Sequence, residues 1–205
     1  MDRLREGLSA FGLGSSTGIE IGDNPGLLPS NPIGENQAPW AAYGQSNQLY
    51  TPIQLANALA TLVSGGEHYE AHLLKEVSTY DRSQVIYTQP DKPVNTVEMA
   101  PSTLNAVKSG MRKLTTTGSL ASYFKDCVVD AGAKTGTAQL GGDTVNNGVF
   151  VCFAPYDDPE IAVAIVIEQG GSGSALASTA VEILNAWFTA DQIGGVIIGE
   201  NQLIP

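Results

Sequence analysis

The sequence is poor in cysteine, histidine and basic residues, and it contains no long hydrophobic run. Two cysteines and two histidines among 205 residues provide neither a disulfide framework nor a typical set of metal ligands. Ten basic residues against 21 acidic ones give a net charge of -11, which argues against nucleic acid and anionic lipid as partners. The longest aliphatic run, residues 161–167, is far too short to cross a membrane.

The composition is that of a globular protein, with 42% hydrophobic and 15% charged residues. The length suffices for one domain with a substantial core. We expect this domain to cover residues 1–190. Residues 191–205 form an apolar-tinged tail that the sequence does not assign to the core.

Helix signals recur along the chain. Thr51, Pro52 and Gln54 together provide an N-cap, a proline in the first turn and a capping box. A second helix is predicted from Pro101, and a shorter one within residues 1–11. The last helix is predicted to reach Phe188, with inward side chains at Leu176, Ala180, Leu184 and Trp187.

Strand signals are concentrated in two regions. Residues 73–80 and 84–89 are predicted to form a hairpin. Residues 132–139, 148–154 and 161–167 are predicted to be three consecutive strands with short connections. Residues 22–48, rich in proline, glycine and asparagine, are interpreted as a long loop. The pattern favours an α+β fold in which helices flank an antiparallel sheet.

The stretch from Gly132 to Gln139 carries the most specific chemistry. It is small and polar, with Lys134 as its only charge, so another backbone can approach it closely. If it is an edge strand, Thr135 and Thr137 point backbone groups the same way, toward a peptide added alongside. Lys134 and the two hydroxyls then suit an anionic end group. The tripeptide Lys-Thr-Gly alone is weak, because composition yields it in roughly one such chain in twenty.

Other candidate sites are weaker. His68 and His72 are four residues apart, a spacing at which helical histidines share a metal. They follow two glycines that end a helix, so packing or solvated histidines are the better interpretation. The glycine-rich stretch 170–174 lacks a basic neighbour and is interpreted as a loop with an N-cap rather than a phosphate site. Cys152 lies in an apolar run and is interpreted as a core residue. We predict no metal and no organic cofactor.

In its order of motifs the chain resembles the C-terminal part of a class B penicillin-binding protein transpeptidase domain. The resemblance rests on the helix opening at residues 50–56, the strand at 132–139, and the two strands around residues 150–155 and 158–163. It covers roughly residues 8–190, and the set in this order is specific although no single motif is. The fold it implies is a partial penicillin-binding or β-lactamase-like transpeptidase fold.

The resemblance also implies an activity, the cross-linking of cell-wall peptides by serine acyl transfer. In that family the Lys-Thr-Gly strand binds the D-Ala-D-Ala end of the substrate. Carried over here, Lys134 supplies a positive field, and Thr135 and Thr137 bind the carboxylate and the peptide backbone. Gly136 keeps the strand open, and the Thr137 N–H faces the oxyanion. Lys134 and Thr137 are thus the expected catalytic contributors, and Thr135, Gly136 and Thr137 the expected substrate-binding residues.

The sequence departs from the family pattern at the nucleophile. It contains no Ser-x-Asn triplet, and its single Ser-x-x-Lys pattern is Ser122 to Lys125, nine residues before Lys134 measured lysine to lysine. The family places its nucleophile far earlier, on another element, so Ser122 is interpreted as a surface or turn residue. We therefore expect a fragment that lacks the serine and is inactive alone.

The expected partners follow from the same resemblance. They are the peptidoglycan stem peptide and β-lactams through the complete site, with self-association or pairing with the missing N-terminal half where apolar surface is exposed. The parent protein is expected at the outer face of the cytoplasmic membrane, and the fragment itself is expected to be soluble. An alternative function is a non-catalytic module that binds a peptide carboxylate or acts as a scaffold.

Overall fold

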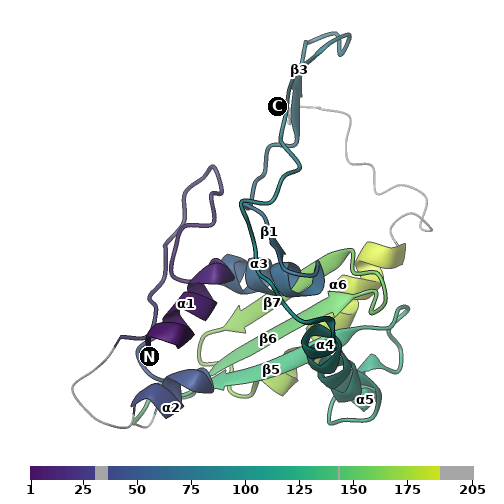
Figure 1. Ribbon diagram of the computed structural model, residues 1–205. Coiled ribbons are helices and arrows are strands. Elements are labelled where there is room, and N and C mark those ends of the chain that lie inside the picture. The colour runs from purple at the N-terminus through teal and green to yellow at the C-terminus, as the bar shows by residue number, and fades with distance from the viewer. Residues whose placement is uncertain (31–36, 143, 190–205) are drawn as a thin grey trace. The chain divides into compact units, whose positions relative to one another are not determined.

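The computed structural model describes residues 1–30, 37–142 and 144–189 (Figure 1). Its contacts divide the chain into two units, which are described separately. Unit 1 comprises Met1–Val107 and Ala138–Thr144, and unit 2 comprises Lys108–Thr137 and Val145–Pro205. Within the described ranges, no helix has the length and apolar character needed to cross a membrane.

Unit 2 is built on a three-stranded sheet. Its strands are β5 (Gly132–Ala138), β6 (Asn147–Ala154) and β7 (Ile161–Ile167), in the order β5-β6-β7. Strands β6 and β7 pair in antiparallel register without a shift, from Gly148 opposite Ile167 to Ala154 opposite Ile161. The three predicted strands are confirmed, and so is the predicted α+β class, because helices flank this sheet (Figure 1).

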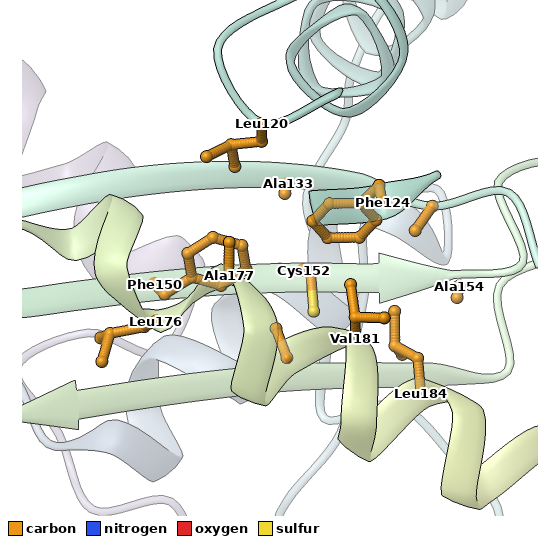
Figure 2. Close-up of a cluster of buried hydrophobic side chains, with 12 residues drawn as sticks. Leu120, Phe124, Ala133, Phe150, Cys152, Ala154, Leu176, Ala177, Val181 and Leu184 are labelled. Atoms are coloured by element: carbon orange, nitrogen blue, oxygen red, sulfur yellow. The ribbon is translucent and has the colours of Figure 1, made fainter. Parts of the chain in front are cut away.

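One face of the sheet is covered by the C-terminal helix and by the segment before the sheet. The 3-10 helix η1 (Gly173–Leu176) leads into α6 (Ala177–Thr189), and α5 (Ala121–Phe124) joins them in a single hydrophobic cluster. Figure 2 shows this cluster, in which Phe150 and Cys152 of β6 face α6. The rings of Phe124 and Phe150 stack at 6.5 Å between centroids. Burial of one such side chain contributes about 1.5–3 kcal/mol, so this cluster dominates the stability of unit 2.

The other face of the sheet contacts helix α4 (Pro101–Thr116), whose predicted start is confirmed. A Cβ built on Gly132 would lie 2.5 Å from the Phe153 ring and 3.2 Å from the Cβ of Met111. Glycine is therefore required where β5 begins, because any side chain there would displace the buried ring. The predicted connection between α4 and β5 contains the one-turn helix α5, which the sequence did not signal.

The prediction for the inward face of α6 is correct at three positions and wrong at one. Leu176, Ala180 and Leu184 are buried, but Trp187 is 57% exposed. The buried series advances by three and four residues to Phe188, which packs against the cluster. At 3.6 residues per turn, Trp187 lies at the edge of that face and Phe188 nearer its centre.

Unit 1 contains small elements around helix α3 (Pro52–Val63). The predicted capping box is present: the Thr51 side chain accepts from the Gln54 N–H, and the Gln54 side chain accepts from the Thr51 N–H at 2.9 Å. The other elements of this unit are α1 (Asp2–Ala10), α2 (Gln37–Ala42), β1 (Glu67–His68), β2 (Glu76–Ser78), β3 (Val85–Thr88) and β4 (Asn95–Thr96).

The predicted long loop at residues 22–48 is only partly correct. Residues 31–36 lie outside the described residues, and Gln37–Ala42 form helix α2. Pro39 made this segment look irregular, but it occupies the third position of the helix. The N–H groups of the first turn have no partner inside a helix, so a proline there costs little.

The predicted hairpin is confirmed but shorter. Strands β2 and β3 pair in antiparallel fashion, with a register shift between Val77 and Ser78. All four residues of β3 are exposed. The predicted tail, residues 191–205, lies outside the described residues.

Candidate functional site

The candidate site is strand β5, which occupies one edge of the sheet in unit 2. Its neighbour is β6, and among the described residues no further strand pairs with its other edge. The edge position on which the sequence interpretation depended is therefore present. An open strand edge offers backbone donors and acceptors to an extended ligand.

Buried contacts at its N-terminal end hold β5 in place. The Ala133 side chain is fully buried in the hydrophobic cluster, and Figure 2 shows it facing that cluster. The hydroxyl of buried Thr115 donates to the Ala131 carbonyl at 2.7 Å. Arg112 forms an ion pair with Asp130, whose carbonyl accepts from the Tyr156 N–H at 2.8 Å. These contacts fix the position of the N-terminal end of β5.

The middle of β5 is held by a close backbone contact. A Cβ built on Gly173 of η1 would lie 2.2 Å from the carbonyl oxygens of both Gly136 and Val149. Real Cβ atoms do not approach so closely, so only glycine fits at this position. A Cβ on Gly136 itself would lie 3.2 Å from the Val149 Cβ, a tight but smaller conflict. The glycine of Lys-Thr-Gly is thus packed against backbone on one side.

The polar side chains of β5 remain accessible. Lys134 and Thr137 are exposed, and Thr135 and Gly136 are half-buried. The Lys134 ammonium donates to the Thr135 carbonyl oxygen at 2.6 Å. Strand alternation puts Thr135 and Thr137 on the same side as Ala133, and Lys134 on the opposite side. The four predicted residues are thus consecutive on one open strand edge, with the Lys134 side chain on the opposite face of the sheet from the two threonine hydroxyls.

The family model that describes the "Penicillin binding protein transpeptidase domain" matches residues 1–187. The chain belongs to this family. The peptidoglycan D,D-transpeptidase MrdA of Escherichia coli strain K12 is 31% identical to this chain over 218 aligned positions. That alignment covers 93% of this chain and 34% of MrdA, so the chain spans about a third of its relative's length.

Solved structures of penicillin-binding proteins share the fold. Penicillin-binding protein 2B of Streptococcus pneumoniae strain R6 matches with a TM-score of 0.80 at 25% identity, covering 92% of this chain and 32% of that protein. PBP2 of Pseudomonas aeruginosa matches with a TM-score of 0.75 at 27% identity, covering 100% of this chain and 46% of that protein. The family resemblance inferred from the motifs is therefore confirmed.

The Ser-x-x-Lys pattern of this chain, residues 122–125, lies on the one-turn helix α5 and its C-cap. Ser122 is exposed on α5. The Lys125 ammonium lies 3.7 Å from the Asp126 carboxylate, and its side chain is 69% exposed. The surface interpretation of Ser122 agrees with this arrangement.

Burial changes the pKa of both cysteines and of His68. Cys152 is fully buried, and burial raises the pKa of its thiol to about 12. Burial also raises the pKa of Cys127, and neither cysteine is in a disulfide. Burial lowers the pKa of His68, against the opposing charge of Glu70. In the described part of the chain, no three metal-binding side chains gather at one point.

Sequence reasoning missed Gly173, which fixes the backbone of Gly136. The glycine-rich stretch was interpreted as a loop with an N-cap, and the Ser172 side chain does accept from the Ser174 N–H. The interpretation was correct but incomplete, since a close approach between segments distant in sequence leaves no local pattern. The alternation of glycine and serine at residues 170–174 was the only available signal.

Proposed function

We propose that this chain provides the substrate-binding strand of a peptidoglycan D,D-transpeptidase. The observation that carries the proposal is the open edge of β5, with Lys134 and Thr137 exposed along it. The name of the E. coli relative, a peptidoglycan D,D-transpeptidase, supports the same reaction class. The ligand would be the D-Ala-D-Ala end of a stem peptide, or a β-lactam that imitates it.

Each residue of the strand has a role in this proposal. The Lys134 ammonium attracts the terminal carboxylate, because an exposed edge leaves its charge without a paired anion in the described structure. To contact the ligand it exchanges its present bond to the Thr135 carbonyl for one to the carboxylate. Thr135 and Thr137 hold the carboxylate and the peptide backbone. The Thr137 N–H stabilises the oxyanion that forms on acyl transfer.

The covalent step needs a nucleophilic serine, and we identify none among the 205 residues. Neither a Ser-x-Asn triplet nor a Ser-x-x-Lys motif well ahead of β5 occurs in the sequence. A strand that binds substrate cannot replace the nucleophile, because no acyl-enzyme forms without it. We therefore assign this chain one wall of the active site and expect no acylation from it alone. The complete enzyme would act at the outer face of the cytoplasmic membrane.

The test is intact-mass measurement after incubation with a penicillin, on protein that circular dichroism shows to be folded. We expect no adduct from this chain alone. An adduct should form when a second chain is added that carries the part of E. coli MrdA outside the matched region, and it should form on that second chain. A penicillin adduct on this chain alone would overturn the assignment and direct attention to Ser122.

A variant pair separates ligand binding from a purely scaffolding role. Lys134→Ala should weaken binding of a D-Ala-D-Ala peptide, measured by calorimetry on this chain, by roughly tenfold or more, since a charge-assisted hydrogen bond contributes about 1.5–3 kcal/mol. Lys125→Ala removes another exposed lysine, which lies outside the strand, and should leave affinity unchanged. Equal affinities for both variants would leave scaffolding as the surviving function.

A further inference from the structure

The peptide bond between Gly136 and Thr137 has a defined orientation in strand β5. A Cβ built on Gly173 would lie 2.2 Å from the carbonyl oxygens of both Gly136 and Val149, and 3.0 Å from the Gly136 nitrogen. Two oxygens that lie so close to one point also lie close to each other, and Val149 belongs to the neighbouring strand β6. The Gly136 carbonyl therefore points toward β6, between the two strands.

This orientation decides which backbone groups of β5 face its open edge. In a planar trans peptide bond the N–H points opposite to the carbonyl, so the Thr137 N–H points away from β6. The N–H and the carbonyl of one strand residue point to the same side, so the Gly136 N–H points toward β6. The Thr135 carbonyl, in the same peptide unit, then points to the open edge, where the Lys134 ammonium contacts it at 2.6 Å. The Thr137 N–H and the Thr135 carbonyl are thus two groups that face this edge.

The turn that leads to Gly173 is held by a side chain from the start of β6. The Asn147 side-chain oxygen accepts a hydrogen bond from the Gln169 N–H at 2.9 Å. Gln169 has a φ of 53°, a left-handed conformation that is uncommon for residues other than glycine and costs free energy. The hydrogen bond offsets part of this cost. Asn147 therefore stabilises the conformation that Gln169 adopts.

Backbone contacts extend this constraint along the turn. The Gly170 N–H donates to the Ile167 carbonyl at 3.1 Å, and the Gly171 N–H donates to the Asn146 carbonyl at 2.8 Å. A single residue separates Gly171 from Gly173, so little chain is left in which a shift of the turn could be absorbed. A change in the turn should therefore move Gly173 relative to the carbonyls that it contacts.

We propose that Asn147 is a positioning residue for the substrate-binding strand. Its side chain fixes the turn, and the turn places Gly173 against the Gly136 carbonyl. That contact keeps the Thr137 N–H directed toward the carbonyl of the ligand, which has to accept from this N–H before acyl transfer converts it into an oxyanion. The inference rests on the proposed function, which supplies the peptide ligand. All of the contacts that carry it lie within unit 2.

Proton–nitrogen NMR spectra of the chain, recorded during titration with a D-Ala-D-Ala peptide, test the proposal. Asn147→Ala should shift the Gly136 and Thr137 amide resonances of the chain without ligand. It should also weaken peptide binding by roughly two- to tenfold, the loss expected for one neutral hydrogen bond. Asn147→Asp keeps an oxygen that accepts from the Gln169 N–H, so it should return both resonances close to their original positions.

Asn146→Ala is the matched control. Asn146 is the preceding residue and is also half-buried, but it holds the turn through its backbone carbonyl, which the substitution retains. Its amide resonances at Gly136 and Thr137 and its peptide affinity should therefore equal those of the original chain. An effect of Asn146→Ala as large as that of Asn147→Ala would overturn the inference. An Asn147→Asp chain that behaves like Asn147→Ala would also overturn it.

Thermal unfolding of the same variants separates positioning from stability. A lower unfolding temperature of Asn147→Ala, with unchanged peptide affinity and unchanged Thr137 resonances, would show a stabilising role alone and contradict the inference. If the peptide binds the original chain and Asn147→Ala equally well, this inference is wrong and the proposed function stands. If the peptide binds neither chain, the proposed function is wrong, whereas shifted Gly136 and Thr137 amides would still confirm that Asn147 sets the geometry of the strand.

Discussion

Unit 2 is held together by apolar packing, whereas buried polar groups organise unit 1. Among the described residues, the buried apolar side chains of unit 1 are Leu13, Pro29, Ala41 and Leu59, and its buried polar side chains are Thr17, Gln54, Thr61 and His68. In unit 2 most of the buried side chains form one cluster on the sheet, and Thr115 is its buried polar residue. Hydrophobic burial is not directional, so it tolerates small shifts of the side chains. A buried polar group that loses its hydrogen-bond partner, in contrast, lowers the stability of the fold.

The strands show the same contrast. Strand β6 alternates between half-buried and buried residues up to Cys152 and is buried through Ala154, whereas β3 is exposed throughout although it contains Val85, Ile86 and Tyr87. A two-stranded hairpin without a packed face is marginal in water. Burial therefore depends on whether a second layer covers the strand, and hydrophobic composition alone does not predict it.

The largest expected effect comes from removing a core side chain of unit 2. Phe150→Ala should lower the free energy of unfolding by about 3–5 kcal/mol, because it leaves a cavity under α6. The control is Ile86→Ala in the hairpin, which should change stability by less than about 0.5 kcal/mol. Urea unfolding followed by circular dichroism measures both. Similar losses in the two variants would mean that the hairpin is covered in solution.

The second effect concerns the close backbone contact at β5. Gly173→Ala should destabilise unit 2 by roughly 1–3 kcal/mol, because the new methyl group overlaps two carbonyl oxygens. It should also shift the amide resonances of Gly136 and Thr137, because the edge strand β5 can move to relieve this overlap more easily than the buried helix α6 can. Gly148→Ala is the matched control, as the nearest atoms to its Cβ lie at 3.5 Å. Unshifted Gly136 and Thr137 amides in Gly173→Ala would contradict the contact.

The third effect is expected at the buried amide of unit 1. The Gln54 Nε2 donates to the carbonyls of Ser15 and Pro25, both at 2.8 Å. Gln54→Ala should cost about 1–2 kcal/mol, because these carbonyls lose a partner and the capping box is broken. Thermal unfolding and limited proteolysis near residues 15–25 measure the change. Gln84→Ala, at an exposed position of the hairpin, should have no comparable effect.

The smallest effect is a pH dependence that His68 should give to unit 1. The Thr61 hydroxyl donates to the Asn57 carbonyl, so its oxygen accepts from the Nδ1 of His68 at 2.8 Å. Burial lowers the pKa of His68 below its ordinary value of 6.5, so the unfolded chain takes up the proton first. The contribution of His68 to the free energy of unfolding should therefore be fully present above pH 6.5 and decrease as the pH falls below 6.5.

Unfolding midpoints measured at several pH values would test this dependence. His68→Gln should reduce the slope below pH 6.5. A slope that survives His68→Gln would assign the effect to other groups.

The features that could be predicted from the sequence are those with local signals. Thr51, Pro52 and Gln54 define a helix start within four residues, and the apolar runs of β6 and β7 are unambiguous over their whole length. The Lys-Thr-Gly strand was recognised from its own residues and their order relative to other motifs. The roles of its residues remain predictions, because no ligand contact tests them.

The features that escaped prediction depend on contacts between distant segments. Gln54 was recognised as a capping residue, but its bonds to Ser15 and Pro25 require the folded loop. Pro39 made the short helix α2 hard to predict. Trp187 lies at the edge of a helical face, where a difference of one residue decides whether a side chain is buried. A hollow of unit 1 is lined by Trp40 and Gln139 from segments about 100 residues apart, and no local pattern marks such a meeting.

The open edge of β5 also exposes the protein to its own copies. An unpaired strand of small residues is a template on which a second molecule can add a strand, and a charge on the edge is a common protection against this. Lys134 stands in the middle of that edge, so the lysine proposed to attract a carboxylate would also repel the same strand of another copy. A Lys134→Ala variant then loses two properties together, and its ligand affinity is meaningful only on material that elutes with the same oligomeric state as the original chain.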